Sequence, residues 1–147
     1  MALTAINKEE IVQEWAADNP YLTDELYLDY LGERNGNCSI SPVASDNVIA
    51  TYIDGSKLKE YKFALQVMLP VSTVSDVVNA DNMFTMRKWQ AWIEDQEKLK
   101  NYPDFGELTS DYELSNLNNM PAMVMRLDNG LAKYQFFARL RYVENEE

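Results

Sequence analysis

Apolar side chains recur at every second position of residues 61–69, and this alternation constrains the fold more than any other feature of the chain. The odd-numbered positions are all large and apolar: Tyr61, Phe63, Leu65, Val67 and Leu69. Successive side chains of a β-strand point to opposite faces, so this period of two predicts a strand. Pro70 has no N–H to donate to a ladder and is expected to end that strand.

The residues before this strand predict its hairpin partner. Gly55 can adopt a positive φ without steric cost and Asp54 tolerates left-handed geometry, so Val48–Leu69 is predicted to form a hairpin around Asp54-Gly55. A second hairpin is predicted from Ala122–Leu127 and Leu131–Val143, joined at Asp128-Asn129-Gly130. In its last arm one face carries Tyr134, Phe136, Ala138, Leu140 and Tyr142, and the other carries Gln135, Phe137, Arg139 and Arg141. Two such arms predict one shared sheet.

Two short helices are predicted near the N-terminus. The first runs from about Lys8 to Ala17, with Asn7 as its N-cap and acidic residues in its first turn. The second is expected over Glu25–Leu31, where Thr23 could act as the cap and the apolar residues fall in a helical stripe.

A longer helix is predicted over Ala80–Lys100, capped by Asn79 or Asp81. Its apolar positions fall near one face: Met83, Met86, Trp89, Ile93 and Leu99, with Trp92 beside them. A pair of tryptophans could form a stacking platform for bases or sugars, but on an amphipathic helix core packing is the better interpretation. We therefore expect Trp89 and Ile93 to pack against Phe63 and Leu65.

The remaining segments complete an α+β fold in a single domain, residues 1–147. Cys38–Ala44 is predicted to be a strand that Pro42 places at an edge or a bulge, and Thr109–Leu117 is a second strand. Val71–Val78 is expected to be a loop, and residues 1–5 and 144–147 are expected to be frayed. The predicted architecture is a mainly antiparallel sheet with the long helix packed on one face and the short N-terminal helices beside it.

The composition narrows the classes of function. A formal charge of −11 argues against a nucleic-acid-binding surface on the scale of the whole chain. The chain has no histidine, which excludes histidine-based triads and histidine-ligated zinc. Cys38 is the sole cysteine, so no internal disulfide can form, and without a histidine partner it is expected to be a buried hydrophobe. No apolar run is long enough to span a bilayer, and no signal peptide is recognisable, so a cytosolic protein is expected.

No motif for a reaction was found. The glycines are scattered and form no phosphate loop. Asp128-Asn129-Gly130 resembles the start of a calcium loop, but the later ligands do not follow. The acidic residues between Glu94 and Glu97 could pair for acid/base chemistry, although a solvated helix face explains them better. We therefore expect a non-enzyme with no metal and no cofactor.

The order of these segments resembles the tail terminator proteins of long-tailed bacteriophages and phage-tail-like particles, also called tail completion or minor capsid proteins. The resemblance covers about Ile6 to Val143. It depends on the segments YIDGSKLKEYKFALQVMLP, NADNMFTMRKWQAWIEDQEKL, NYPDFGEL and LAKYQFFARLRYVEN.

The resemblance implies a homohexameric ring on the growing end of the tail tube, where it halts polymerisation and offers a surface for joining the head. The implied partners are further copies of the chain, the tail tube protein, and neck, connector or sheath proteins, with DNA passing through the ring. The implied location is the host cytoplasm during assembly and then the neck end of the virion tail. A net acidic ring would also keep a DNA duplex from adhering to it.

Two other functions stay open. A neck or head–tail connector subunit would form a ring of a different number of copies, and an α+β protein that binds a small ligand would show a convergent polar pocket. For the ring, the predicted oligomer interface comprises Phe137, Arg139 and Arg141. Phe137 lies opposite the other aromatic residues of its strand, where a monomer would leave it exposed, and the two arginines could face acidic groups of a neighbour.

Overall fold

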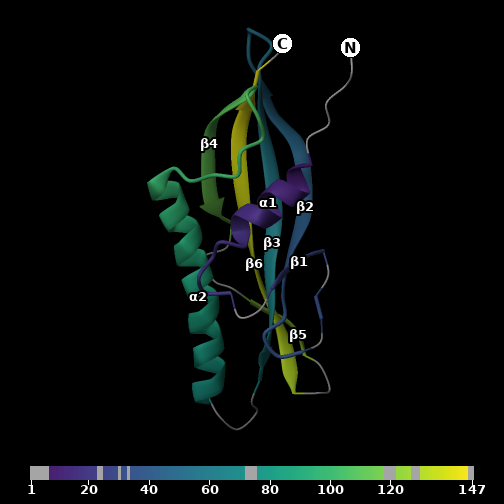
Figure 1. The fold of residues 1–147 in the computed structure, drawn as a ribbon, viewed down its shortest axis with the longest axis vertical. Helices are drawn as coiled ribbons and strands as arrows, with labels where there is room; N and C mark the ends of the chain where they lie inside the picture. The colour runs from purple at the N-terminus through teal and green to yellow at the C-terminus, as the bar shows by residue number, and fades with distance from the viewer. Residues whose placement is uncertain are drawn as a thin grey trace.

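The computed structural model describes residues 7–22, 25–29, 31–32, 34–71, 76–117, 122–126 and 130–145. Within these ranges the chain forms α1 (Lys8–Ala16), β1 (Leu26–Leu28), β2 (Cys38–Thr51), β3 (Lys57–Pro70), α2 (Asp76–Leu99), β4 (Thr109–Asn116), β5 (Ala122–Arg126) and β6 (Leu131–Glu144). Figure 1 shows a tall, twisted sheet with α1 crossing in front of it and α2 standing along its left side. The predicted α+β class is confirmed.

The sheet is built on β3 and β6, the two strands with alternating apolar residues. They pair antiparallel without interruption from Lys57–Glu144 to Pro70–Leu131. β2 pairs with the other edge of β3, while β4 and β5 pair with the two halves of the other edge of β6. The short β1 pairs parallel with the start of β2, so the sheet is mixed rather than wholly antiparallel.

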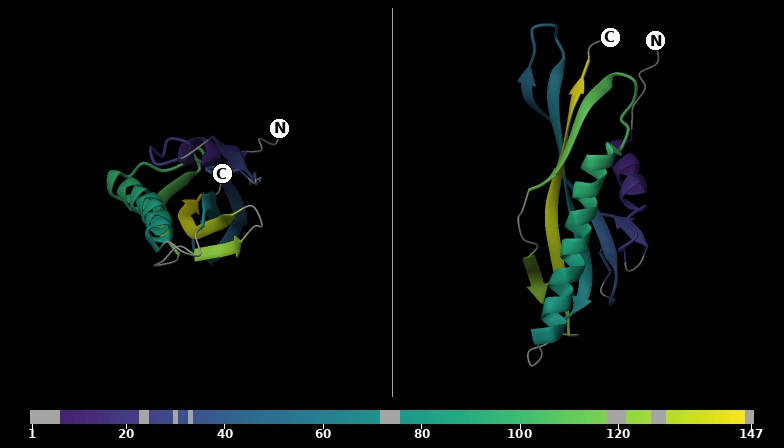
Figure 2. Two further views of the ribbon diagram at one scale, coloured as in Figure 1. Left: turned by 90° about the horizontal axis from the view of Figure 1, so that it is seen from below. Right: turned by 90° about the vertical axis from the view of Figure 1, so that its left-hand side faces the viewer.

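The core lies between the sheet and the two helices, which cover the same face (Figure 2). We call this the inner face, and the opposite one the outer face. All five odd positions of residues 61–69 are buried, as are all five even positions of residues 134–142, so both alternation predictions are confirmed. Trp89 and Ile93 are fully buried with Phe63 and Leu65 in one cluster, as expected.

Aromatic contacts attach α1 to this core. The rings of Trp15 and Phe63 meet edge to face with centroids 6.1 Å apart, and Trp15 also lies 4.9 Å from Trp92 of α2. The indole Nε1 of Trp15 donates a hydrogen bond to the carbonyl of Asn101. The helix begins where predicted, since the Asn7 side chain accepts a hydrogen bond from the backbone N–H of Glu10. The two helices and the sheet therefore share one core.

The predicted helix over Glu25–Leu31 is wrong: residues 26–28 form β1. Leu26 is buried while Tyr27 and Leu28 are exposed, and the segment pairs in register with Cys38–Ile40. Asp29 then takes a positive φ of 53°, which interrupts any helical run. Tertiary pairing with β2 has overridden the local helical pattern. Thr23, its predicted cap, lies outside the described residues.

The predicted bounds of other elements also need correction. Cys38–Ala44 and the first hairpin arm form one continuous strand, β2, because register shifts absorb the irregular residues between them. α2 begins at Asp76, so neither Asn79 nor Asp81 is its cap, and part of the predicted loop is helical. Glu144 is the last residue of β6, lies opposite Lys57 in the register and forms an ion pair with Lys59, so the strand continues into the segment predicted to be frayed.

Two side chains lie elsewhere than predicted. Leu99 is 72% exposed at the end of α2 and takes no part in the core. Phe137 is half-buried rather than exposed. The described residues include no helix with the length and apolar character needed to cross a membrane.

Candidate functional site

A cluster of charged side chains on the outer face includes two of the three predicted interface residues. Glu60 is only 3% exposed, although its neighbours on the face reach solvent. Its carboxylate accepts a 3.0 Å hydrogen bond from Nε of Arg141 and lies 3.2 Å from Nζ of Lys62. A guanidinium nitrogen of Arg139 lies 3.9 Å away. We call Glu60, Lys62, Arg139 and Arg141 the basic cluster.

Sheet register explains how these residues meet. Glu60 pairs with Arg141 and Lys62 pairs with Arg139 across β3 and β6, so all four point to the same face. Burial raises the pKa of Glu60, but the hydrogen bonds and charges of Arg141 and Lys62 outweigh burial and hold that pKa below its usual value. Glu60 is therefore a carboxylate at neutral pH.

The basic cluster carries more positive than negative charge. Three cations surround one buried carboxylate, and the side chains of Lys62, Arg139 and Arg141 are 36%, 28% and 30% exposed. Glu113 of β4 lies opposite Arg141 in the register, so a second acidic residue borders them. A positive surface on a chain with a charge of −11 is suited to binding an acidic group.

Phe137 lies further along the same face, next to Ala64 of β3 in the register. The structure thus brings all three predicted interface residues to one face. It also shows what the sequence could not: Arg139 and Arg141 already have a buried partner in their own chain. Their spacing on a strand was visible in the sequence, whereas Glu60 was hidden because its pairing depends on register between distant segments.

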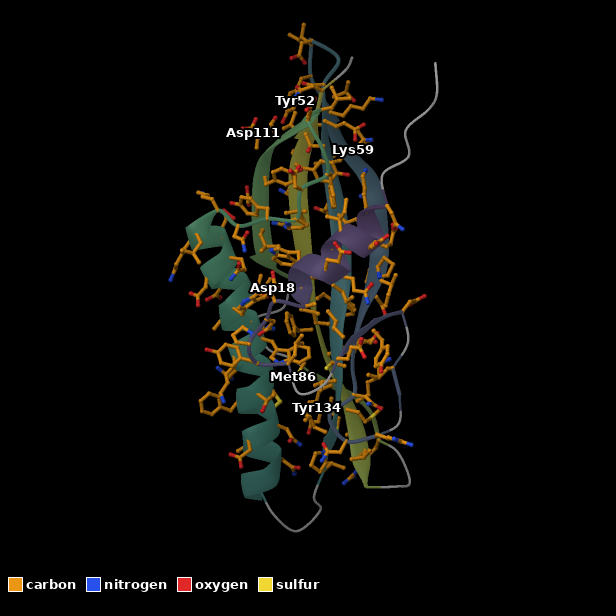
Figure 3. The ribbon with its side chains drawn as sticks, viewed as in Figure 1. Asp18, Tyr52, Lys59, Met86, Asp111 and Tyr134 are labelled. Atoms are coloured by element: carbon orange, nitrogen blue, oxygen red, sulfur yellow. The ribbon has the colours of Figure 1, made fainter. Side chains whose placement is uncertain are left out.

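A second feature is the apolar surface of β2 and the hairpin turn after it, which sequence analysis missed. Five exposed apolar residues lie on this segment, which we call the hairpin surface: Val43, Val48, Ile49, Tyr52 and Ile53. Ile53 at the turn is fully exposed. Tyr52 lies near one end of the long axis of the molecule, as Figure 3 shows. Several exposed apolar side chains on one segment are typical of a surface that contacts a partner.

The backbone of β2 is also open on this side. β1 pairs only with Cys38–Ile40, and no other described strand pairs with the outer edge of β2. The strand carries three register shifts and Pro42, features that discourage unspecific strand addition at an edge. The hairpin surface is therefore more suited to contacts through side chains than to extension of the sheet.

The opposite sheet edge, at β4, is covered. α2 lies against it, and Oε2 of Glu97 accepts hydrogen bonds from the backbone N–H of Leu114 and from the hydroxyl of Tyr102. Burial, and then the bond to Glu97, raise the pKa of Tyr102 well above its ordinary value. This carboxylate closes an edge donor that would otherwise be left without a partner.

A groove of about 460 Å³ lies between α2 and β4, lined by Gln90, Glu94, Glu97, Lys98, Leu114, Ser115 and Asn116. It brings Glu94 and Glu97 to one hollow, the arrangement that sequence analysis could not show. Glu97, however, already accepts hydrogen bonds from the hydroxyl of Tyr102 and from the backbone N–H of Leu114. One of the two carboxylates is thus held by donors of its own chain, which favours a structural role for Glu97 over acid/base chemistry.

Other candidates are accounted for structurally. Cys38 is buried, and its thiol lies 3.4 Å from the carbonyl oxygen of Gly36. Asp128 and Asn129 of the calcium-like segment lie outside the described residues. Within the described ranges, no group of three or more Cys, Asp or Glu side chains is arranged to hold a metal ion.

Comparison with protein-family models finds no match to this chain, and comparison with curated proteins finds none either.

Proposed function

We propose that this chain is a structural protein of a phage-type tail, a ring-forming terminator that caps the tail tube, stops its polymerisation and supports the joining of the head. The proposal combines the resemblance in sequence with one structural observation, the hairpin surface. An apolar surface that projects at one end of an elongated subunit is well placed to contact the end of a tube, while its long sides remain for neighbouring copies (Figure 1).

The charge and the packing support a structural role. The core is rich in aromatic residues, and some charged side chains form ion pairs between strands of the sheet, such as Lys59 with Glu144. A ring subunit needs a rigid sheet and two unlike surfaces, so that one surface of each copy contacts the other surface of the next copy around the ring axis. This chain has unlike edges, one open at β2 and one covered by α2.

The test is an assay of tube length. Purified chain is added to tail tube protein of the same particle during polymerisation, and tube lengths are measured by electron microscopy. The wild type is expected to give short tubes capped at one end. Ile49→Asp with Ile53→Asp should fold and fail to cap, because it places charge on the hairpin surface. Leu99→Asp, a similarly exposed apolar position on α2, is the matched control and should cap normally.

The outcomes separate the alternatives. Wild-type protein that leaves tube length unchanged would refute the terminator function. Binding to head portals rather than tube ends would favour the neck or connector function. The double variant capping as well as wild type would mean that the hairpin surface is not the contact with the tube.

A further inference from the structure

The basic cluster lies on the outer face, and the outward side of α1 carries an acidic row on the opposite side of the molecule. Glu10, Glu14 and Asp18 are all exposed and recur every four residues, so they follow one another along one side of the helix and the turn after it. Figure 3 shows Asp18 at the end of α1, in front of the sheet. We call these three residues the acidic row.

The buried side of α1 fixes the direction of the acidic row. Val12, Trp15 and Ala16 face the core, and Lys8, the cation of this helix, is drawn inward, with its ammonium 3.0 Å from the hydroxyl of Tyr142. Lys8 also lies 3.9 Å from Glu144. The acidic side chains are therefore left facing away from the sheet, without a neighbouring cation of their own helix.

The two surfaces match in sign and spacing. Side chains four apart on a helix are separated by a rise of about 6 Å. Arg139 and Arg141, two apart on β6, are separated by about 7 Å, and Lys62 lies on the adjacent strand, about 5 Å from Arg139. Two neighbouring carboxylates of the acidic row can therefore approach Arg139 and Arg141, while Lys62 adds positive charge beside them.

The sheet lies between the two surfaces, so they cannot meet within one chain (Figure 2). We propose that the acidic row of one copy binds the basic cluster of the next. Such a contact joins two different surfaces, so it repeats from copy to copy and closes into a ring when the rotation allows. The inference rests on the proposed ring function and names the joint between its subunits. The hairpin surface is left free for the tube.

Site-specific cross-linking tests the joint. In a Cys38→Ala background, one chain carries Glu14→Cys and a second carries Lys62→Cys, and the two are mixed at high concentration with a short bismaleimide. Only a contact between chains can join them. The matched control replaces Glu14→Cys with Asp95→Cys, an exposed acidic position on α2. We expect a severalfold higher yield of the joined dimer from the first pair, and a yield that falls with added salt.

Charge exchange provides the second arm. Asp18→Lys with Glu10→Lys, placed in the chain that carries Glu14→Cys, should reduce the cross-link to the control level. In a separate background, chains bearing Asp18→Lys should recover cross-linking when mixed with chains bearing Arg139→Glu. Thermal unfolding followed by circular dichroism verifies that each variant is folded.

A yield equal to that of the Asp95→Cys control would overturn the joint. A short DNA duplex that binds the wild type but not Lys62→Glu, without excess cross-linking, would assign the basic cluster to nucleic acid and also overturn it. If the cross-link yield equals that of the control while the wild type still caps tubes, the joint is wrong and the proposed function stands. If the cross-link is specific but the wild type never caps tubes, the proposed function is wrong and the contact between copies stands.

Discussion

Nε of Arg141 donates a 3.0 Å hydrogen bond to Oε2 of Glu60, across the central pair of strands. This bond holds a buried carboxylate on the outer face of the sheet, the face that the helices do not cover. It fixes both the local charge of that face and the orientation of the cations around it.

Glu60→Gln should lower the free energy of unfolding at neutral pH by about 1.5–3 kcal/mol, because charge-assisted hydrogen bonds are lost. The pKa of Glu60 is depressed in the folded state, so its contribution is present above the unfolded pKa of about 4.3 and is lost as pH falls through the lower folded pKa. Urea unfolding at several pH values measures this. The variant should lose less stability than wild type on acidification, and an equal loss would contradict the assignment.

Trp89→Ala should cost about 3–5 kcal/mol, because the indole is fully buried and lies near Phe136, with ring centroids 6.5 Å apart. Leu99→Ala on the same helix is the control and should change stability by less than about 0.5 kcal/mol, since its side chain is exposed. Chemical denaturation of both variants checks the prediction. A loss under about 1 kcal/mol for Trp89→Ala would mean that the tryptophan is not a core residue.

Tyr102→Phe should lower stability at neutral pH by about 0.5–1.5 kcal/mol, because the hydroxyl no longer donates to Glu97. The folded pKa of Tyr102 is raised, so its contribution is fully present below the unfolded pKa of about 10 and is lost as pH rises beyond it. The wild type should therefore lose stability faster than the variant in alkali. The measurement is the free energy of unfolding of both proteins at several alkaline pH values. An equal loss in the two proteins would contradict the role of this bond.

The groove between α2 and β4 should not bind nucleotides, and the protein should hold no stoichiometric metal. The chain lacks histidine and any phosphate-binding motif. Metal analysis and thermal-shift screening against nucleotides are the measurements. A nucleotide that raises the melting temperature by several degrees, and does so less in Gln90→Ala, would favour the alternative of a small-ligand-binding protein.

The sequence predicted those parts of the fold that depend on local pattern. Alternation identified β3 and β6 and the buried face of each, and helical periodicity identified α2 and the burial of Trp89. It failed at residues 26–28, where pairing with β2 decides the structure, and at the continuity of β2, which depends on register shifts. Strand pairing between distant segments is not encoded in a local period.

The candidate surfaces were likewise predictable from the sequence only where they depend on a local pattern. The exposed face of Arg139 and Arg141 followed from alternation, whereas Glu60 could be matched to them only once β3 and β6 were in register. The hairpin surface was missed because apolar residues of β2 resemble core residues in sequence. Their exposure depends on the place of β2 in the sheet, where only the short β1 pairs with its outer edge among the described strands.

The most direct test of the proposed function is electron microscopy of tail tubes polymerised with the purified wild-type chain, with averaging of the tube ends. A ring of six copies of this chain at one end of each tube, together with shortened tubes, is the predicted result. Tubes of unchanged length with bare ends would contradict the proposed function.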